Sequence, residues 1–418
     1  MKKLLLLSAA ASAVIYAGGD ITPIEPSAPA TADFWGQIGF FYQAEDSDLL
    51  GWDMGDKENN WFSATVVLGV DKQFGNGFGF GAEVAGWSGM GFDIGDRTLF
   101  KTVPLIATVV DDTSAEVSQA YLTYSFGNTA IKAGRQALPK AVSPWAWSDR
   151  TGGVVDFSYD GVVIANTDIA GTTLVAAWVD QTNAADPVDN VDVSDKYGLY
   201  MLSAINKSIA ENTTIAVSGY YIPKSQFVRD YQVGRLRDGW SLWASVENGD
   251  DALNWGLQAA YVDGDGRYAN GNEMGETFAV SGKIGSSWGD FDTEFVAGYI
   301  NGGAYSLKNA GSGLGTSAVW TFNGDYGGDA VLSEDQWSVI AKAGYRLPVG
   351  KLYGNLGYWS YDDDATHTLQ DAFDARAGYK FTVSGLSGNI EYRYLTQSFN
   401  NMSDKDRQRV RVEAYYKF

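Results

Sequence analysis

Basic side chains recur at every second position within several segments near the end of the sequence. On the polar side of these segments lie Lys342, Arg346, Arg376, Lys380, Arg393, Arg409 and Arg411. A row of ammonium and guanidinium groups in a confined space attracts anionic groups and orients dipolar solutes. Asp374, Glu391 and Glu413 share this parity, and an equal alternative is that these acids pair with the bases across strands. The sequence leaves both interpretations open.

Few residues could support catalysis. The chain has one histidine, His367, and no cysteine, which removes most zinc, thiol and Ser–His chemistry. We therefore expect no catalytic residue and no cofactor. Acidic segments between strands, including residues 362–364 beside His367, leave a divalent cation such as Ca²⁺ open as a ligand, and solvated loops are the alternative. The net charge of −21 argues against nucleic acid as a partner.

The elements that carry these residues have a period of two, which predicts an all-β protein. We expect 18 strands, with 16 as the alternative. The predicted strands are 33–43, 60–73, 78–90, 114–126, 129–136, 156–166, 172–180, 195–206, 212–222, 239–247, 252–263, 275–287, 290–300, 335–347, 350–361, 369–383, 387–398 and 406–418.

The connections between these strands alternate in length. Short turns such as 127–128 and 288–289 alternate with long polar loops such as 91–113, 137–155 and 301–334. A bacterial outer-membrane barrel has this organisation, with antiparallel strands, short periplasmic turns and long extracellular loops. We therefore predict one transmembrane antiparallel β-barrel over residues 33–418.

The two faces of the predicted strands agree with a barrel in lipid. In strand 60–73 one face is apolar from Phe62 through Val66 and Leu68, while Ser63 and Thr65 occupy the other. Aromatic residues bracket an aliphatic band, as a lipid-facing surface requires. The opposite face is too charged to form a dry core. We expect water to fill the interior.

The first residues read as a targeting segment. Residues 1–17 begin with Lys2 and Lys3, continue with an apolar stretch and end in small residues, which predicts a secretory signal peptide. Residues 18–32 contain Pro23, Pro26 and Pro29 and are predicted to form a periplasmic lead-in. We expect the mature chain in the outer membrane of a Gram-negative bacterium.

Several stretches resemble the Opr-type porins of ε-proteobacteria, which include the major outer-membrane porin of Campylobacter-like bacteria. They are "GGDITPIEP", "SQAYLTYSFGNTAIKAGRQ" (residues 118–136), "NTDIAGTTLVAAWV" (residues 166–179) and the terminal "VRVEAYYKF". The resemblance implies an 18-stranded barrel, usually a homotrimer, whose third extracellular loop bends inward. Residues 137–155 would form this constriction loop, with Pro144, Trp145, Asp149 and Arg150 packed in it. An ordinary surface loop is the alternative.

The resemblance also makes Arg135 a candidate pore-lining residue, because Gly134, Arg135 and Gln136 would lead into the constriction loop. Simple alternation disagrees, since Arg135 has the parity of Ile131 and Ala133, which we assign to the lipid face. A β-bulge would be needed to turn Arg135 inward.

The chain ends in a strand with one apolar and one charged face, in the segment "RQRVRVEAYYKF". We expect this strand to close the barrel against strand 33–43. The final aromatic residues Tyr416 and Phe418 resemble the signal that the barrel-assembly machinery reads.

The predicted function is that of an outer-membrane porin, a water-filled channel for passive diffusion of ions and small hydrophilic solutes. Expected partners are outer-membrane lipid, lipopolysaccharide and the barrel-assembly machinery. A secreted soluble carbohydrate-binding β-protein is the alternative, and an outer-membrane barrel enzyme is a weaker one.

Overall fold

The chain folds into β-strands joined by turns and loops. The computed structural model describes residues 32–48, 51, 53–54, 60–89, 114–148, 150–151, 155–182, 191–192, 197–223, 238–250, 252–264, 266–267, 273–274, 276–301, 319–320, 335–361, 369–400 and 403–418. Within these ranges, no helix is long and apolar enough to cross a bilayer.

Twenty-three strands follow one another within these described ranges. They are β1 (Asp33–Ser47), β2 (Asn60–Gln73), β3 (Phe78–Ser88), β4 (Ser114–Phe126), β5 (Thr129–Gln136), β6 (Arg150–Thr151), β7 (Val155–Asp156), β8 (Tyr159–Asn166), β9 (Thr172–Thr182), β10 (Val191–Asp192), β11 (Leu199–Asn206), β12 (Thr213–Pro223), β13 (Asp238–Gly249), β14 (Asn254–Gly264), β15 (Gly266–Arg267), β16 (Glu273–Met274), β17 (Thr277–Trp288), β18 (Phe291–Asn301), β19 (Gln336–Arg346), β20 (Lys351–Tyr361), β21 (Leu369–Val383), β22 (Leu386–Phe399) and β23 (Lys405–Lys417).

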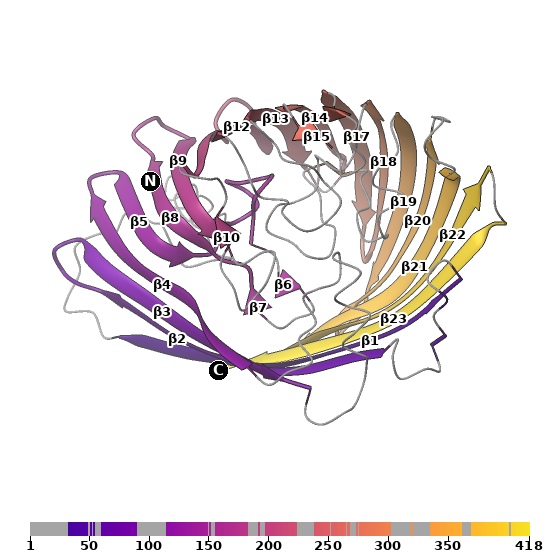
Figure 1. Ribbon diagram of the computed structural model, residues 1–418, viewed down its shortest axis with the longest axis horizontal. Helices are drawn as coiled ribbons and strands as arrows, with labels where there is room; N and C mark the ends of the chain where they lie inside the picture. The colour runs from indigo at the N-terminus through magenta and orange to yellow at the C-terminus, as the bar shows by residue number, and fades with distance from the viewer. Residues whose placement is uncertain are drawn as a thin grey trace.

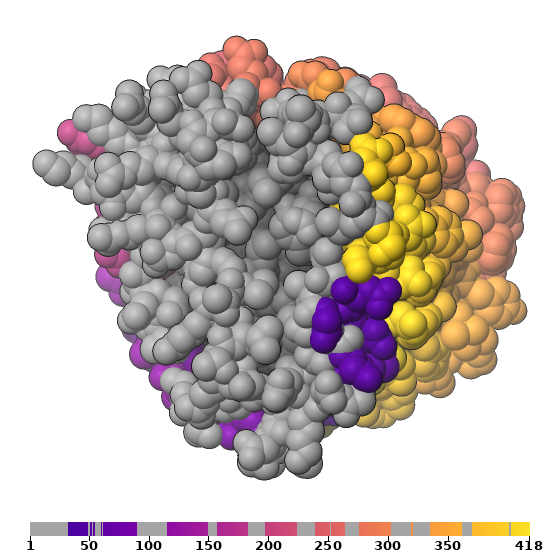
Figure 2. Space-filling view, turned by 45° about the vertical axis from the view of Figure 1, so that its right-hand side comes forward, coloured from indigo at the N-terminus to yellow at the C-terminus, as the bar shows by residue number. Residues whose placement is uncertain are grey.

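The main sheet closes on itself. It holds 19 strands, of which β10 is a two-residue strand paired with β9, so 18 long strands remain in the ring. Each pairs antiparallel with the next, and β23 pairs with β1 from Gln37↔Lys417 to Ser47↔Arg407. Figure 1 shows the ring and the adjacent first and last strands, and in Figure 2 indigo and yellow residues meet on the surface. The predicted 18-stranded antiparallel barrel is confirmed.

Short turns join the strands in hairpins at one end of the ring. The β21–β22 connection consists of Ser384 and Gly385, with φ angles of 48° and 87°. Two successive positive φ angles define a type I′ turn, whose twist matches that of the strands it joins. At the other end the connections are longer, and the one between β5 and β8 carries the β6–β7 pair inside the ring (Figure 1).

The strand boundaries differ from the predicted ones in a few places. β1 continues to Ser47, four residues beyond its predicted end, because its backbone continues to pair with β23 as far as Arg407. The predicted strand 156–166 is divided, since β7 belongs to the inward connection and only β8 belongs to the ring.

The outward side chains form an extended apolar surface. Leu68 is 55 % exposed, Leu122 67 % and Leu257 59 %, and aromatic residues lie near the strand ends on the same face. A water-soluble protein rarely exposes so continuous an apolar surface, whereas a transmembrane barrel requires one.

Candidate functional site

The densest ionic cluster on the inner wall centres on Asp374 of β21. Its Oδ1 accepts a hydrogen bond from Nε of Arg393 at 2.9 Å, and its Oδ2 accepts one from Nη2 of the same residue at 3.1 Å. Nε of Arg376 donates to Oδ2 at 2.9 Å. The side chains of Asp374 and Arg393 are only 4 % and 3 % exposed. One carboxylate therefore holds two guanidinium groups in place on neighbouring strands.

Further ionic side chains lead from this cluster toward the pairing of β23 with β1, which closes the barrel and is called the seam below. We call the whole series the ionic row. Nη2 of Arg409 lies 3.4 Å from Oε1 of Glu391, and the hydroxyl of Tyr353 donates to Oε2 of the same carboxylate at 2.9 Å. Arg411 donates to Oε1 of Gln43 through Nε at 3.0 Å and Nη2 at 2.8 Å. The row thus spans from β20 through β23 to β1.

Two lysines extend the row on the other side. Nζ of Lys342 lies 2.7 Å from Oε1 of Glu294, and Nζ of Lys351 lies 2.8 Å from Asp292. Arg346, the last residue of β19, keeps the inward parity beside the periplasmic-type turn and is exposed. Lys342, Arg393 and Arg409 thus form ion pairs across strands, and Arg376 pairs with Asp374 on its own strand, which matches the pairing interpretation for these four bases.

Arg135 lies on the outer face. It pairs with Ala120 of β4 and with Asp160 of β8, and β5 has no register shift against either strand. Its Nε donates to Oδ1 of Asp160 at 2.9 Å and its Nη2 donates to Oδ2 at 3.1 Å. Within the described β5 there is no β-bulge that would turn Arg135 inward. Its side chain therefore follows simple alternation and faces outward, which argues against a pore-lining role.

The segment after β5 folds into the ring and covers part of its inner wall. Residues 137–148 bury Pro144 and Trp145, and Trp145 is 6 % exposed. The hydroxyl of Tyr220 lies 3.2 Å from Oγ of Ser143 and accepts a hydrogen bond from the backbone N–H of Trp145 at 3.3 Å. Oγ of Ser203 donates to the carbonyl of Val142 at 2.7 Å.

The other two constriction-loop candidates are described less completely. Asp149 lies outside the described residues. Arg150 belongs to β6, where its backbone pairs with Asp156, and its side chain lies outside the described part. His367 and residues 362–364 are also outside it. Within the described ranges, no group of three or more His, Asp or Glu side chains is arranged to hold a metal ion.

An apolar inner wall lies beneath the inward segment, and the sequence reasoning missed it. Val163, Val175, Met201 and Trp243 are inward and buried in one cluster with Trp145. The available signal was weak alternation: segments such as "VVIA" and "LVAAWV" are apolar on both faces, as expected of strands buried on both sides. The interior therefore has a packed apolar half on β8–β14, while β19–β23 combine the charged side chains with a smaller buried apolar cluster that includes Trp359, Leu395 and Phe399.

A second long connection also reaches the inner wall. The backbone N–H of Trp320 donates to Oε1 of Gln258 at 3.0 Å, and Nζ of Lys283 lies 4.3 Å from the Trp320 ring centroid. Lys283 also binds Glu247, with 2.6 Å between Nζ and Oε2. Trp320 was predicted only as part of a polar loop, because a single aromatic residue in such a loop carries no periodic signal.

The predicted assembly residues lie at the seam. The backbone of Phe418 exchanges two hydrogen bonds with Gly36, at 2.8 and 3.0 Å. The rings of Tyr416 and Phe418 stack outward with centroids 6.4 Å apart. Phe418, which directly follows β23, thus continues the pairing with β1.

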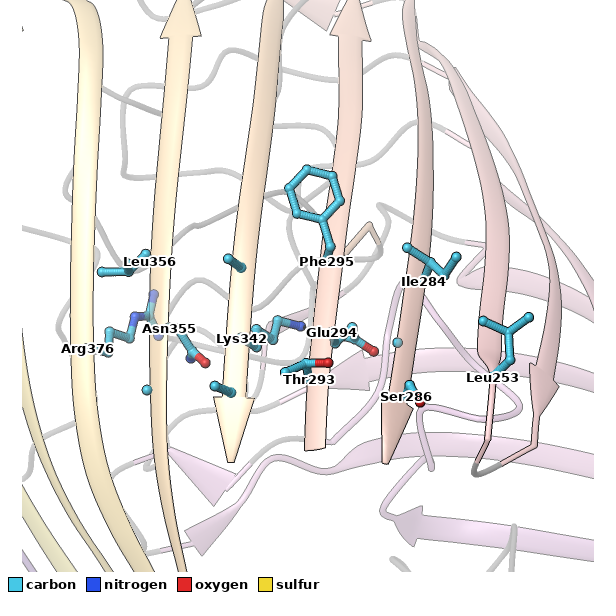
Figure 3. Close-up of a pocket in the computed structure, with 14 residues that line it drawn as sticks. Leu253, Ile284, Ser286, Thr293, Glu294, Phe295, Lys342, Asn355, Leu356 and Arg376 are labelled. Carbon is cyan, nitrogen blue, oxygen red and sulfur yellow. Dashed lines mark hydrogen bonds and ion pairs between the residues drawn. The ribbon is translucent and has the colours of Figure 1, made fainter. Parts of the chain in front are cut away.

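A hollow of about 700 Å³ lies at the barrel wall between β17 and β21. Figure 3 shows Ile284 of β17, Phe295 of β18 and Leu356 of β20 around it. These side chains have outward parity and are 48–54 % exposed. The lining also includes Glu294, Lys342 and Arg376 of the inner wall, so residues of both faces of the wall surround the hollow.

Comparison with known proteins finds solved structures with a similar fold but low sequence identity. No family model matches the chain, and no curated protein matches it. Similar solved structures include OccK3 (OpdO) of Pseudomonas aeruginosa, with a TM-score of 0.63 and 15 % identity over 92 % of this chain and 96 % of that chain. OccK5 (OpdH) of the same organism has a TM-score of 0.65 and 12 % identity over 93 % and 98 %.

OpdK of Pseudomonas aeruginosa, solved with vanillate, has a TM-score of 0.65 and 13 % identity over 92 % of this chain and 99 % of that chain. These neighbours are outer-membrane porins with 18-stranded barrels. At such identities the likeness establishes the barrel fold.

Proposed function

We propose that this chain is an outer-membrane porin, through which ions and small hydrophilic solutes diffuse passively. The observation that carries the proposal is the division of the interior. Inward segments pack against the apolar half, while the half bearing Asp374, Arg376 and Lys342 keeps ionic side chains that need water or polar solutes beside them. An 18-stranded barrel is wide enough to contain both.

The lining suits charged or dipolar solutes more than apolar ones. Acids and bases alternate along it, so a solute that exchanges its hydration shell finds both donors and acceptors. Within the central cluster, Lys342, with its side chain 38 % exposed, and Arg376, at 20 %, are more accessible than Arg393, at 3 %. We expect the accessible pair to contact permeants and Arg393 to hold the wall together.

Planar-bilayer recording tests the proposal directly. The purified, folded barrel should give discrete ohmic conductance steps that scale with salt concentration. A protein that shows heat-modifiable migration, and so has a folded barrel, yet never conducts would refute it. Release from envelopes by salt or urea without detergent would instead support the soluble carbohydrate-binding alternative.

The finer identity follows the sequence motifs. We propose kinship with the Opr-type porins of ε-proteobacteria, carried by the 118–136 hairpin and the terminal strand. With it we propose a signal peptide at residues 1–17, a periplasmic lead-in at 18–32, a homotrimer, and contacts with lipopolysaccharide and the barrel-assembly machinery. Determining the mass of the mature protein, and from it the position of its N-terminus, would test the proposed signal peptide.

A further inference from the structure

Five inward residues form one register row near the end of the ring that carries the short turns. Asp292, Gly344, Tyr353, Gly378 and Glu391 lie on β18, β19, β20, β21 and β22 and are direct cross-strand partners. An acid stands at each end of the row, and a glycine stands on each side of the tyrosine. A glycine inside a strand often marks a place where another group approaches the backbone closely. Both of these glycines have such a group lying over them.

The ring of Tyr353 lies across Gly378 and reaches the second strand beyond its own. A Cβ atom at Gly378 would lie 2.6 Å from Cε1 of Tyr353 and closer still to its Cζ and hydroxyl oxygen. The hydroxyl donates to Oε2 of Glu391 at 2.9 Å and lies 3.0 Å from Oδ1 of Asn389, both on β22. The β20 and β22 backbones are two strand spacings, about 10 Å, apart. The ring therefore lies along the wall instead of pointing into the pore.

Lys351 lies across Gly344 in the opposite direction. A Cβ atom at Gly344 would contact Cε of Lys351, and it would lie 2.8 Å from both Nζ of Lys351 and Oδ2 of Asp292. The ammonium group reaches Asp292 on β18, at 2.8 Å. Lys351 is also the direct cross-strand partner of Lys380 on β21, and like charges at opposite positions repel. Its path across Gly344 leads the ammonium group away from that neighbour.

These side chains border the water-filled interior. The side chain of Lys351 is 43 % exposed, Tyr353 and Gly378 are half-buried, and Lys380 is exposed, with its Nζ 5.1 Å from the centroid of the Tyr353 ring. Behind the ring lies the backbone of β21, which blocks outward movement. A ring displaced from Gly378 would therefore have to move inward, into the path of solutes.

We propose that Gly378 and Gly344 determine the width of the pore at its short-turn end, because they allow Tyr353 and Lys351 to lie flat against the wall. The two glycines are thus size-selecting positions on the charged wall, separate from the inward segment 137–148 on the apolar half. The inference rests on the proposed porin function and assigns to that pore a second determinant of the size of its solutes.

Single-channel recording of Gly378→Ala tests the inference. The added Cβ should lift the Tyr353 ring off β21 and lower the conductance by about twofold at high salt, where charge effects are screened. The size limit for neutral polymers that enter the pore should fall as well. Gly378→Ala combined with Tyr353→Ala should restore both quantities, because the displaced ring is gone.

Gly354→Ala is the matched control on β20. Residue 354 follows Tyr353 directly but has outward parity, and a Cβ there would meet the carbonyl oxygen of Arg376 at an ordinary 3.4 Å. Its conductance and polymer size limit should equal those of the unsubstituted protein. Heat-modifiable migration would confirm that each variant is folded before it is recorded.

Gly344→Ala provides a second measurement that decides the matter if Gly378→Ala does not fold. It should displace Lys351 and narrow the pore, and the addition of Lys351→Ala should relieve the narrowing. Unchanged conductance and size limit in the folded glycine variants, or narrowing that persists after the displaced side chain is removed, would overturn the proposal and leave the porin function standing. An unsubstituted, folded barrel that never conducts would refute the porin function, and this inference with it.

Discussion

At the scale of single residues, Asp374 is the most consequential member of the ionic row. Asp374→Asn removes the charge that compensates the buried Arg393, so we expect a loss of about 3 kcal/mol in the free energy of unfolding. Arg376 loses an ionic partner too, and the reversal potential across a salt gradient should shift toward anion selectivity. Urea titration and bilayer recording measure the two effects.

Asp292→Asn is the control for this substitution. Asp292 and Lys351 form a half-exposed pair, with side chains 36 % and 43 % exposed, and such pairs contribute about 1 kcal/mol or less. If both substitutions destabilise the barrel equally, the distinction between the buried and the exposed ion pair is wrong.

Residue parity was readable from the sequence, and residue partners were not. The bases on β19–β23 keep the inward face that alternation assigns, and Arg135 keeps the outward one. The sequence offered Asp374 and Glu391 only as acids on the same face as the bases. Which base each one contacts, and the pairing of Arg135 with Asp160, depends on strand register, which in a barrel follows from shear and turn geometry rather than from any local pattern.

At the scale of elements, Tyr220 on β12 links the inward segment to the wall. Tyr220→Phe removes the hydroxyl shared by Ser143 and the N–H of Trp145, at a cost of about 1–3 kcal/mol for the unsatisfied N–H. We expect the segment to loosen, with larger and noisier single-channel conductance.

Tyr221→Phe offers a matched control because Tyr221 is the next residue on β12 and points outward, 46 % exposed. Its conductance should equal that of the unsubstituted protein. An unchanged pore in the Tyr220→Phe barrel would mean that apolar packing around Trp145 holds the segment without this hydrogen bond.

Most of the strands were predictable, because they alternate between apolar and polar residues and end in a short turn with a Gly or Asn residue. The packing of the inward segments against the barrel wall was less predictable. Where β8, β9 and β11 are apolar on both faces, alternation gives no contrast, and the contact of Trp320 with Gln258 joins a loop to a strand far away in the sequence. Such contacts follow from the closed shape of the ring, which no local window contains.

At the scale of the whole molecule, closure depends on the close approach of Gly36 and Phe418. A Cβ atom at Gly36 would lie 2.5 Å from Cζ of Phe418, so Gly36→Val should displace the terminal ring and lower the yield of folded barrel. Gly282→Val is the control, since a Cβ there would meet Leu257 at 3.4 Å. Heat-modifiable migration of the membrane fraction measures the folded yield, and equal yields would contradict this role for Gly36.

The pairing of β1 with β23 also determines when the barrel can close. Arg411 and Gln43 are 368 positions apart in the sequence, so the last hydrogen-bond ladder forms between the earliest and latest strands to be made. A chain cut short before β23 lacks the edge on which β1 closes, and it keeps two unpaired strand edges that invite aggregation. Closure thus requires that β1 and β23 both be present, and a chain without either strand cannot form a sealed wall.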